Sequence, residues 1–210
     1  MVAVKIFYKL KSYIGISVFT KSYALISFIL LFLQQNKNII MSKRISIELR
    51  NKARELGLCN EWFNEWSDTS SKQELIDKYI TGIDFALQHH YPTNQYIKDN
   101  FELELLRKNN ILVDDERNLL NPSVAVILGN TKTKIRVNGF SRSIIYVRDK
   151  SEVDLIVKNS SFVIVHTFDN ASVKVETEDK PSVLILKHSK DATIKTTNGI
   201  KVKEEFDYLK

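Results

Sequence analysis

Apolar and polar residues alternate through the C-terminal part of the chain, in short runs that recur at regular intervals. Apolar runs at residues 144–147, 162–165 and 183–186 each lead into a polar turn, after which the alternation resumes. Alternation with a period of two residues is typical of β-strands that bury one face. The pattern therefore predicts a β-repeat domain over residues 123–210.

The turns between these runs repeat as well. A small residue stands at Ser151, Ala171 and Ala192, at intervals of 20 and 21 residues, and a β-branched residue follows two positions later each time. Equal spacing is what stacked rungs require, with parallel strands along the sides and small residues at the corners. The repeat therefore favours a short β-solenoid.

A small antiparallel β-sandwich is the alternative. The dipeptides Asn138-Gly139 and Asn198-Gly199 suit the tight turn of a β-hairpin, which joins antiparallel strands. Hairpins tolerate loops of unequal length, however, and the spacing here is nearly constant. We therefore favour the solenoid and keep the sandwich as the competing architecture.

Residues 41–113 have helical patterns. Ser46 is placed to cap a helix that ends at Gly57, a residue suited to a left-handed C-cap. Asn60 is placed to cap a short second helix. That helix would carry Trp62, Phe63 and Trp66 on one face, and aromatic residues at this spacing more often belong to a core than to a ligand site.

Two further helices are expected before the strands begin. Ser71-Lys-Gln-Glu74 is a capping box, and the helix that it opens should end before Tyr91-Pro92. Pro92 can then occupy the first turn of another helix, which Asn109-Asn110 closes.

The domain boundary is expected at the acidic link over residues 114–122, which includes Asp114-Asp115-Glu116. The open end of a solenoid exposes strand edges, and an N-terminal helical region is a common cover for them. The fold class is therefore α+β, with a helical N-terminal region capping a short C-terminal β-solenoid.

Residues 1–40 form an apolar and basic leader. Residues 12–33 are apolar or weakly polar except for Lys21, and such a stretch is long enough to span a bilayer. The composition changes at Met41, which looks like an ordinary translation start. We expect a cytoplasmic protein if translation starts at Met41, and a single-pass membrane protein if residues 12–33 are an anchor. A signal peptide fits less well, because no small-residue cleavage site follows.

One turn of the repeat resembles a known sequence unit. Residues 169–173, Asp-Asn-Ala-Ser-Val, are similar to the Asp-Asn-Ala-x-Val unit of β-helical repeat proteins. Residues 58–62, 74–77 and 82–85, followed by Tyr91-Pro92, resemble an uncharacterised family of small proteins from gut bacteria and their phages. The resemblance would cover about residues 56–200, and it implies an architecture and a compartment but no activity.

The net charge of +6 does not by itself indicate nucleic-acid binding. Residues 1–40 contribute +5, residues 41–121 contribute −3 and residues 122–210 contribute +4. No aromatic residue is interleaved with the lysines of the repeat as a stacking platform for bases would require. We therefore do not expect nucleic acid or another polyanion as the partner. The lysines are expected on the outer face of the strands, at Lys132, Lys134, Lys150, Lys158, Lys174, Lys187, Lys195, Lys201 and Lys203.

Four histidines and one cysteine were considered as chemical groups. Cys59 stands beside Trp62 and is expected to be a buried structural thiol. His89 and His90 are adjacent on a helix and would point about 100° apart, so a metal site that includes Asp84 is not favoured. His166 and His188 lie 22 residues apart, off the repeat, so we do not expect them to stack.

Acidic pairs were considered because some β-helices are carbohydrate enzymes. Glu176 with Glu178, and Asp114 with Asp115, lie in lysine-rich surroundings that are typical of a solvated surface. The sequence contains no phosphate-binding loop, no G-x-S-x-G and no H-E-x-x-H motif. We expect no catalytic residue, no cofactor and no metal ligand.

The expected function is therefore that of a non-catalytic binding or structural module. Its repeat surface would be presented to a protein partner or to another copy of the chain. A carbohydrate-active β-helix enzyme and a membrane-anchored surface protein are the two alternatives.

Overall fold

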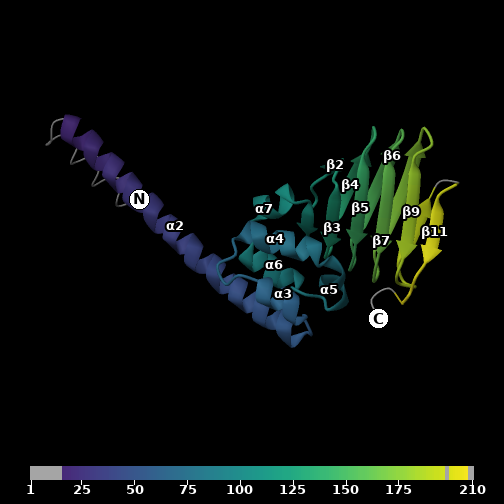
Figure 1. Cartoon of the computed structure of the whole chain (residues 1–210). Helices are drawn as coiled ribbons and strands as arrows, with labels where there is room; N and C mark the ends of the chain where they lie inside the picture. Colours follow the sequence, from purple (N-terminus) through teal and green to yellow (C-terminus); the bar gives the residue numbers. More distant parts are fainter. Residues whose placement is uncertain (1–15, 197–198, 208–210) are drawn as a thin grey trace. The chain divides into compact units, whose positions relative to one another are not determined.

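The structure is a computed structural model, and it describes residues 16–196 and 199–207 (Figure 1). The chain divides into two compact units, residues 1–72 and residues 73–210. The first unit is helical, and the second contains short helices followed by all of the described strands. We describe each unit separately.

The first unit contains α2 (Ile16–Glu55) and α3 (Asn60–Glu65). Ile45, Leu49 and Ala53 are buried at a spacing of four residues, which places them on one face of α2. The helix ends before Gly57, which has a φ of +98°. The predicted helix end is therefore confirmed.

The predicted helix start at Ser46 is wrong, because α2 continues through this position. Ser46 is fully buried, and its Oγ donates a hydrogen bond to the backbone oxygen of Ser67 at 2.7 Å. The same Oγ accepts from Nε1 of Trp66 at 3.1 Å. A serine hydroxyl can cap a helix or bind a distant segment, and here it does the latter.

The predictions for α3 are also corrected. Cys59 occupies the N-cap position, and Asn60 is the first helical residue. Cys59 is exposed, not buried, and no residue of α3 is buried. The aromatic residues of this helix are therefore only partly covered, with Trp62 at 38% exposure.

The prediction of a possible membrane anchor is only partly covered by the structure. Residues 12–15 of that segment lie outside the described residues. Among the helices that are described, none is both long enough and apolar enough to cross a membrane.

The second unit has a helical part made of α4 (Lys72–Thr81), α5 (Ile83–Gln88), α6 (Asn94–Asn100) and α7 (Leu103–Lys108). Helix α4 begins directly after Ser71, as predicted. Gly82 interrupts the helix that was expected to continue toward Tyr91, because it is the non-helical N-cap of α5.

The expected role of Pro92 at the first turn of a helix is wrong. Tyr91-Pro92 is a cis peptide bond, and Thr93 caps α6 by accepting a hydrogen bond from the backbone N–H of Tyr96 at 3.2 Å. Phe101 and Glu102 adopt extended backbone angles, so the single helix expected here is divided into α6 and α7.

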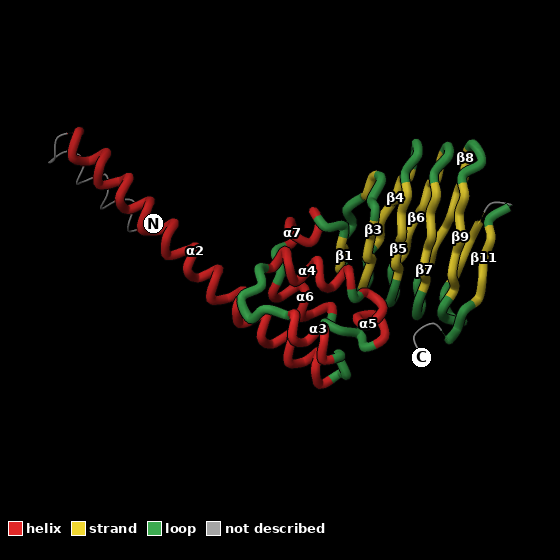
Figure 2. Tube along the Cα trace, in the orientation of Figure 1, coloured by secondary structure: helices red, strands yellow, loops and turns green. Residues whose placement is uncertain are grey.

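The remainder of the second unit is a β-solenoid of about 4 turns (Figure 2). One sheet has the strand order β1-β3-β5-β7-β9-β11, and the other has the order β10-β8-β6-β4-β2. The odd-numbered strands are β1 (Ile111–Val113), β3 (Val124–Leu128), β5 (Arg142–Val147), β7 (Phe162–Thr167), β9 (Ser182–Lys187) and β11 (Lys201–Glu204). The even-numbered strands are β2 (Leu119–Leu120), β4 (Lys132–Val137), β6 (Glu152–Lys158), β8 (Ser172–Glu178) and β10 (Thr193–Thr196).

Every strand pair in the described residues is parallel, so the sandwich alternative is wrong and the solenoid is confirmed. Val153 lies beside Val173, which lies beside Ile194. The predicted intervals of 20 and 21 residues are therefore the register of the ladder. The inward side chains of both sheets form one core, which includes Ile127, Ile145, Val163, Leu155 and Val175.

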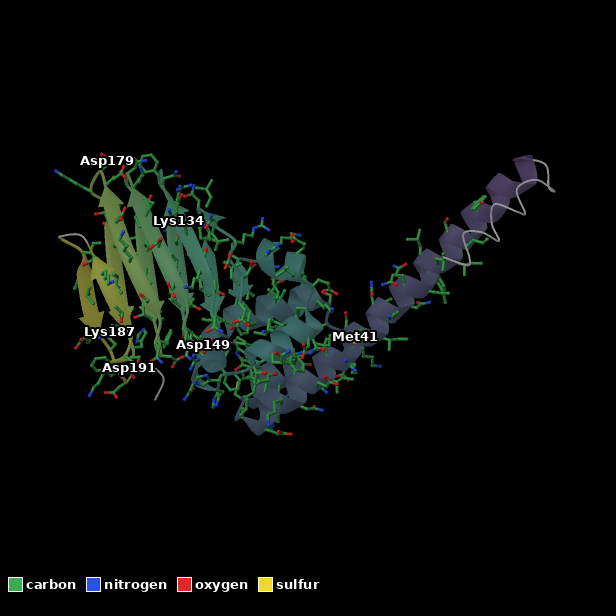
Figure 3. The ribbon with its side chains drawn as sticks, turned by 180° about the vertical axis from the view of Figure 1, so that it is seen from behind. Met41, Lys134, Asp149, Asp179, Lys187 and Asp191 are labelled. Atoms are coloured by element: carbon green, nitrogen blue, oxygen red, sulfur yellow. The ribbon has the colours of Figure 1, made fainter. Side chains whose placement is uncertain are left out.

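Residues with positive φ stand at both corners of the solenoid. One corner has Gly129, Asp149 and Asp169 at successive turns, with φ of 74°, 61° and 51°. Figure 3 shows Asp149 and Asp191 at this end of the strands and Asp179 at the other end. Aspartate, asparagine and glycine tolerate this backbone conformation better than other residues do, so the polar turns of the sequence mark the corners.

The first rung is covered by helices within the same unit. Helices α6 and α7 contact β1, the edge strand of its sheet. The backbone groups at this edge are thereby shielded from pairing with another chain. The helical cap expected from the sequence is confirmed for α6 and α7.

Candidate functional site

The most unusual surface feature is an exposed aromatic corner between β4 and β5. Phe140 is 91% exposed and Phe162, on the next turn, is 44% exposed. Together with Ser141, Arg142 and Ser160 they line a hollow of about 510 Å³. We call these five residues the Phe140 corner.

The local sequence explains why Phe140 projects into solvent. Gly139 has a φ of +75°, and the Oγ of Ser141 donates to the backbone oxygen of Asn138 at 2.7 Å. This tight turn joins strands of two different sheets, so Asn138-Gly139 forms a solenoid corner and not the hairpin that the dipeptide also allows. The turn leaves Phe140 outside the core.

Arg142 provides the charge of the corner. It lies beside Phe162 in the parallel register of β5 and β7. Arg142 is exposed, and no hydrogen bond or ion pair is formed with it by any residue that the structure describes. A guanidinium between two phenyl rings can bind a carboxylate while the rings bind an apolar group.

The two outer faces of the solenoid differ in chemistry. On the sheet of odd-numbered strands, Ile144, Ile164 and Leu184 form a continuous row in the register. On the other sheet, Lys132 pairs with Glu152 at 2.9 Å and Lys158 pairs with Glu178 at 2.7 Å. The apolar row continues from the Phe140 corner, whereas the opposite face is polar.

These ion pairs change the interpretation of the lysines. Lys174 also pairs with a glutamate, Glu176, at 2.7 Å, and Lys134 lies beside Asp154 in the register. The lysines of this sheet therefore alternate with acidic residues across the strands. A continuous basic surface is not formed along these rows.

The acidic pairs considered as glycosidase carboxylates are bound to cations. Asp114 pairs with Lys98, and Asp115 pairs with Arg107 at 2.9 Å. The hydrogen bond from Lys98 lowers the pKa of Asp114, and that from Arg107 lowers the pKa of Asp115. A hydrolytic general acid needs a raised pKa, so this pair does not have the electrostatics of a glycosidase site.

The adjacent histidines turn to different neighbours. The ring of His89 lies 4.6 Å from that of Phe85 between centroids. His90 has a φ of +47°, and its Nε2 contacts a terminal nitrogen of Arg148. Asp84, the metal ligand considered with them, is not part of this contact.

One group with metal-like spacing occurs among the described residues: His90, Asp149 and Asp169 offer ligand atoms that lie within 4.8 Å of one another. Arg148 already places a cation here. Its Nε donates to Asp169 at 2.8 Å, and another nitrogen donates to the backbone oxygen of Leu87. We call Arg148, His90, Asp149 and Asp169 the Arg148 cluster.

His166 and His188 are in contact, contrary to the expectation from their spacing. Nδ1 of His166 lies 3.0 Å from Nε2 of His188, and the ring centroids are 5.2 Å apart. His166 lies beside Leu186 in the register, so His188 reaches back from beyond the end of β9. Burial, followed by the nearby His188, lowers the pKa of His166 to about 4.

Sequence reasoning missed the Phe140 corner and the role of Arg148. A phenylalanine directly after Asn138-Gly139 is unusual for a turn, and this signal could have indicated the corner. Arg148 carried no such signal, because its partners at Leu87 and His90 come from a distant part of the chain.

Comparison with known proteins adds no family: no protein-family model matches the chain, and neither the curated proteins nor the solved structures gave a match.

Proposed function

We propose that this chain is a non-catalytic protein-binding module, and that its partner docks on the Phe140 corner. The observation that carries the proposal is the 91% exposure of Phe140. An aromatic side chain that is this exposed contributes little to the core. Aromatic residues and arginine are, however, the residues that most often dominate the energy of protein interfaces.

The chemistry of the corner suggests the chemistry of the partner. The rings of Phe140 and Phe162 offer apolar surface, and the unpaired Arg142 offers a positive charge. A segment that carries an apolar side chain next to an aspartate or glutamate would satisfy both. We therefore propose an acidic and apolar protein segment as the occupant, with self-association as an outcome to be tested.

A polyanion is a poorer partner on electrostatic grounds. Lys132, Lys158 and Lys174 are each within ion-pair distance of a glutamate. An anionic polymer would have to displace these glutamates, and exposed ion pairs gain little energy that could offset the repulsion. The polar face of the solenoid is thus better suited to contact with water.

A reducing compartment such as the cytoplasm is proposed for the module. The support is the exposed thiol of Cys59, because exposed single thiols tend to form disulfides between chains in oxidising compartments. The redox state of Cys59 in cells, measured by thiol labelling of the native protein, tests this part of the proposal.

The docking proposal is tested by site-specific photocrosslinking in the native host. The photoreactive residue p-benzoylphenylalanine replaces Phe140 in one protein and Lys134, on the polar face, in a control protein. We expect a discrete adduct from position 140 that Arg142→Glu abolishes. Equal adducts from both positions, or none from position 140, would overturn the proposal.

Sedimentation of the purified protein separates the two kinds of partner. If the adduct contains a second copy of the chain, wild type should sediment as a dimer and Phe140→Asp as a monomer. A monomeric wild type together with an adduct of different mass identifies a foreign protein partner.

A further inference from the structure

A pocket of about 320 Å³ lies beside the Arg148 cluster, within the second unit of the chain. Its walls come from α4, from the segment between α5 and α6, and from the corner that follows β5. The polar lining includes Tyr79, His90, Asn94, Arg148 and Asp149. The apolar lining includes Ala86, Leu87, Pro92 and Leu128, and the ring of Tyr91 also contributes.

The charges of this pocket do not cancel. Arg148 is neutralised by Asp169, at 2.8 Å. Asp149 forms no ion pair with any described residue, and its hydrogen-bond partners are neutral: the backbone N–H of Gly129 at 2.7 Å and the side-chain amide of Asn94 at 2.8 Å. The negative charge of Asp149 is therefore left without a cation of its own.

The hydrogen bonds of the pocket are also incomplete. Both neutral donors bind Oδ2 of Asp149, and no donor to Oδ1 is present among the described residues. The hydroxyl of Tyr79 has no hydrogen-bond partner in the same part of the chain. Burial raises the pKa of Tyr79, so this hydroxyl stays protonated and can both donate and accept.

A metal ion is a poor fit for these groups. His90 and Asp169 already use their lone pairs on the guanidinium of Arg148. A divalent ion bound to them would lie next to a buried positive charge. A guanidinium can only donate hydrogen bonds, so it would have to leave before the ion could enter.

We propose that this pocket binds a small ligand through a protonated primary amine. The ammonium group would donate to the free oxygen of Asp149 and to the hydroxyl of Tyr79, and its alkyl part would contact Leu87, Leu128 and Pro92. The tyrosine rings of the lining add an attraction for a cation. This site lies at the corner that follows β5, whereas the Phe140 corner precedes β5, so the two sites are independent.

The proposal is tested with n-butylammonium, 1-butanol and butyrate, three molecules of similar size that differ in charge. Chemical shifts of the backbone amides of the full chain are followed during titration at neutral pH. We expect saturable shifts around Tyr79, Asn94 and Asp149 with n-butylammonium, much weaker shifts with 1-butanol, and none with butyrate.

Two variants show whether the named groups carry the binding. Asp149→Asn keeps an oxygen for Gly129 and Asn94 but removes the charge, and it should weaken n-butylammonium binding at least tenfold. Tyr79→Phe should weaken it less. Asp154→Asn, the same substitution on the exposed polar face, should leave binding unchanged.

Three results would overturn the proposal. These are equal shifts with all three molecules, preference for butyrate, or unchanged binding in Asp149→Asn. Circular dichroism and the unfolding temperature of each variant show whether it is folded. If Asp149→Asn does not fold, the comparison of the three molecules on wild type decides alone.

Discussion

His166 and His188 share a hydrogen bond of 3.0 Å between Nδ1 of the first and Nε2 of the second. The direction of this bond follows from the next one. Nδ1 of His188 lies 2.9 Å from the backbone oxygen of Glu205, which can only accept, so Nδ1 of His188 carries the proton. Nε2 of a neutral His188 then accepts, and Nδ1 of His166 donates. The chain of bonds connects three successive turns of the solenoid.

This arrangement predicts a loss of stability in mild acid. The pKa of His166 is lowered from 6.5 to about 4 in the folded protein, mainly by burial. Between these values the unfolded chain binds more protons, so the free energy of unfolding falls as the pH falls through this window. We expect a loss of about 2 kcal/mol from pH 7.5 to pH 5, measured by urea unfolding.

The control for this prediction is His166→Gln, which retains a hydrogen-bonding amide but does not titrate. Its unfolding free energy should depend less on pH over the same window. The remaining dependence comes from His188, whose pKa is also lowered by burial. Asp114, Asp115 and Glu205 have lowered pKa values and lose their contribution only at lower pH. An unchanged pH dependence in His166→Gln would contradict the assignment.

A second prediction concerns Arg148, which is 5% exposed. Arg148→Met would leave the backbone oxygen of Leu87, Nε2 of His90 and the carboxylate of Asp169 without their donor. Removal of one member of a buried ion pair typically costs about 3 kcal/mol or more. We expect a loss of this size in the free energy of unfolding, measured by urea denaturation.

The matched control is Lys132→Met, which removes an exposed ion pair with Glu152. Exposed pairs contribute little, so its effect should stay below about 1 kcal/mol. Equal effects of the two substitutions would show that Arg148 does not hold the helical segment and the solenoid corner together.

A third prediction separates backbone strain from steric clash at two glycines. Gly129 and Gly139 have φ of 74° and 75°, so alanine is strained to a similar degree at both. A Cβ at Gly139 meets open space, whereas a Cβ at Gly129 would lie 2.2 Å from Oδ1 of Asp114. Gly139→Ala should cost about 1 kcal/mol.

Gly129→Ala should cost clearly more than Gly139→Ala, because Asp114 must move away from its ion pair with Lys98. The measurement is the difference in unfolding free energy between the two variants. The double variant Gly129→Ala with Asp114→Ala removes the clash and should recover part of the difference. A cost at Gly129 no larger than that at Gly139 would rule out the clash.

A fourth prediction concerns the energetic role of Phe140. Because this side chain is 91% exposed, Phe140→Ser should change the free energy of unfolding by less than about 0.5 kcal/mol. Ile145→Ala, in the fully buried core two strand positions after Ser143, should cost about 2–5 kcal/mol. A large loss in Phe140→Ser would assign the ring a structural role and weaken the docking proposal.

The solenoid could be predicted from the sequence because its register is written in the spacing of Ser151, Ala171 and Ala192. Stacked rungs require equal lengths, and few other folds do. Helix boundaries were harder to predict. Ser46 has the chemistry of a cap, but its hydroxyl binds Ser67 and Trp66, a choice that depends on tertiary structure.

The chemistry of single residues was predicted least well, for the same reason. His166 and His188 are off the repeat by sequence, yet the corner after β9 brings them together. Cys59 stands beside aromatic residues but lies at an exposed helix start. Spacing along the chain reports which strands pair, and it does not report which side chains meet at corners or across helices.

The constant parallel register has a consequence for how this type of molecule varies. A closed barrel has a fixed number of strands, whereas each turn here pairs with the next in the same way. Duplication or loss of one turn would preserve the pairing rule, and insertions of other lengths would have to lie in the corners, as the extra residue between β8 and β10 does. Homologous chains are therefore expected to differ by whole turns, each of which lengthens the solenoid by about 4.8 Å.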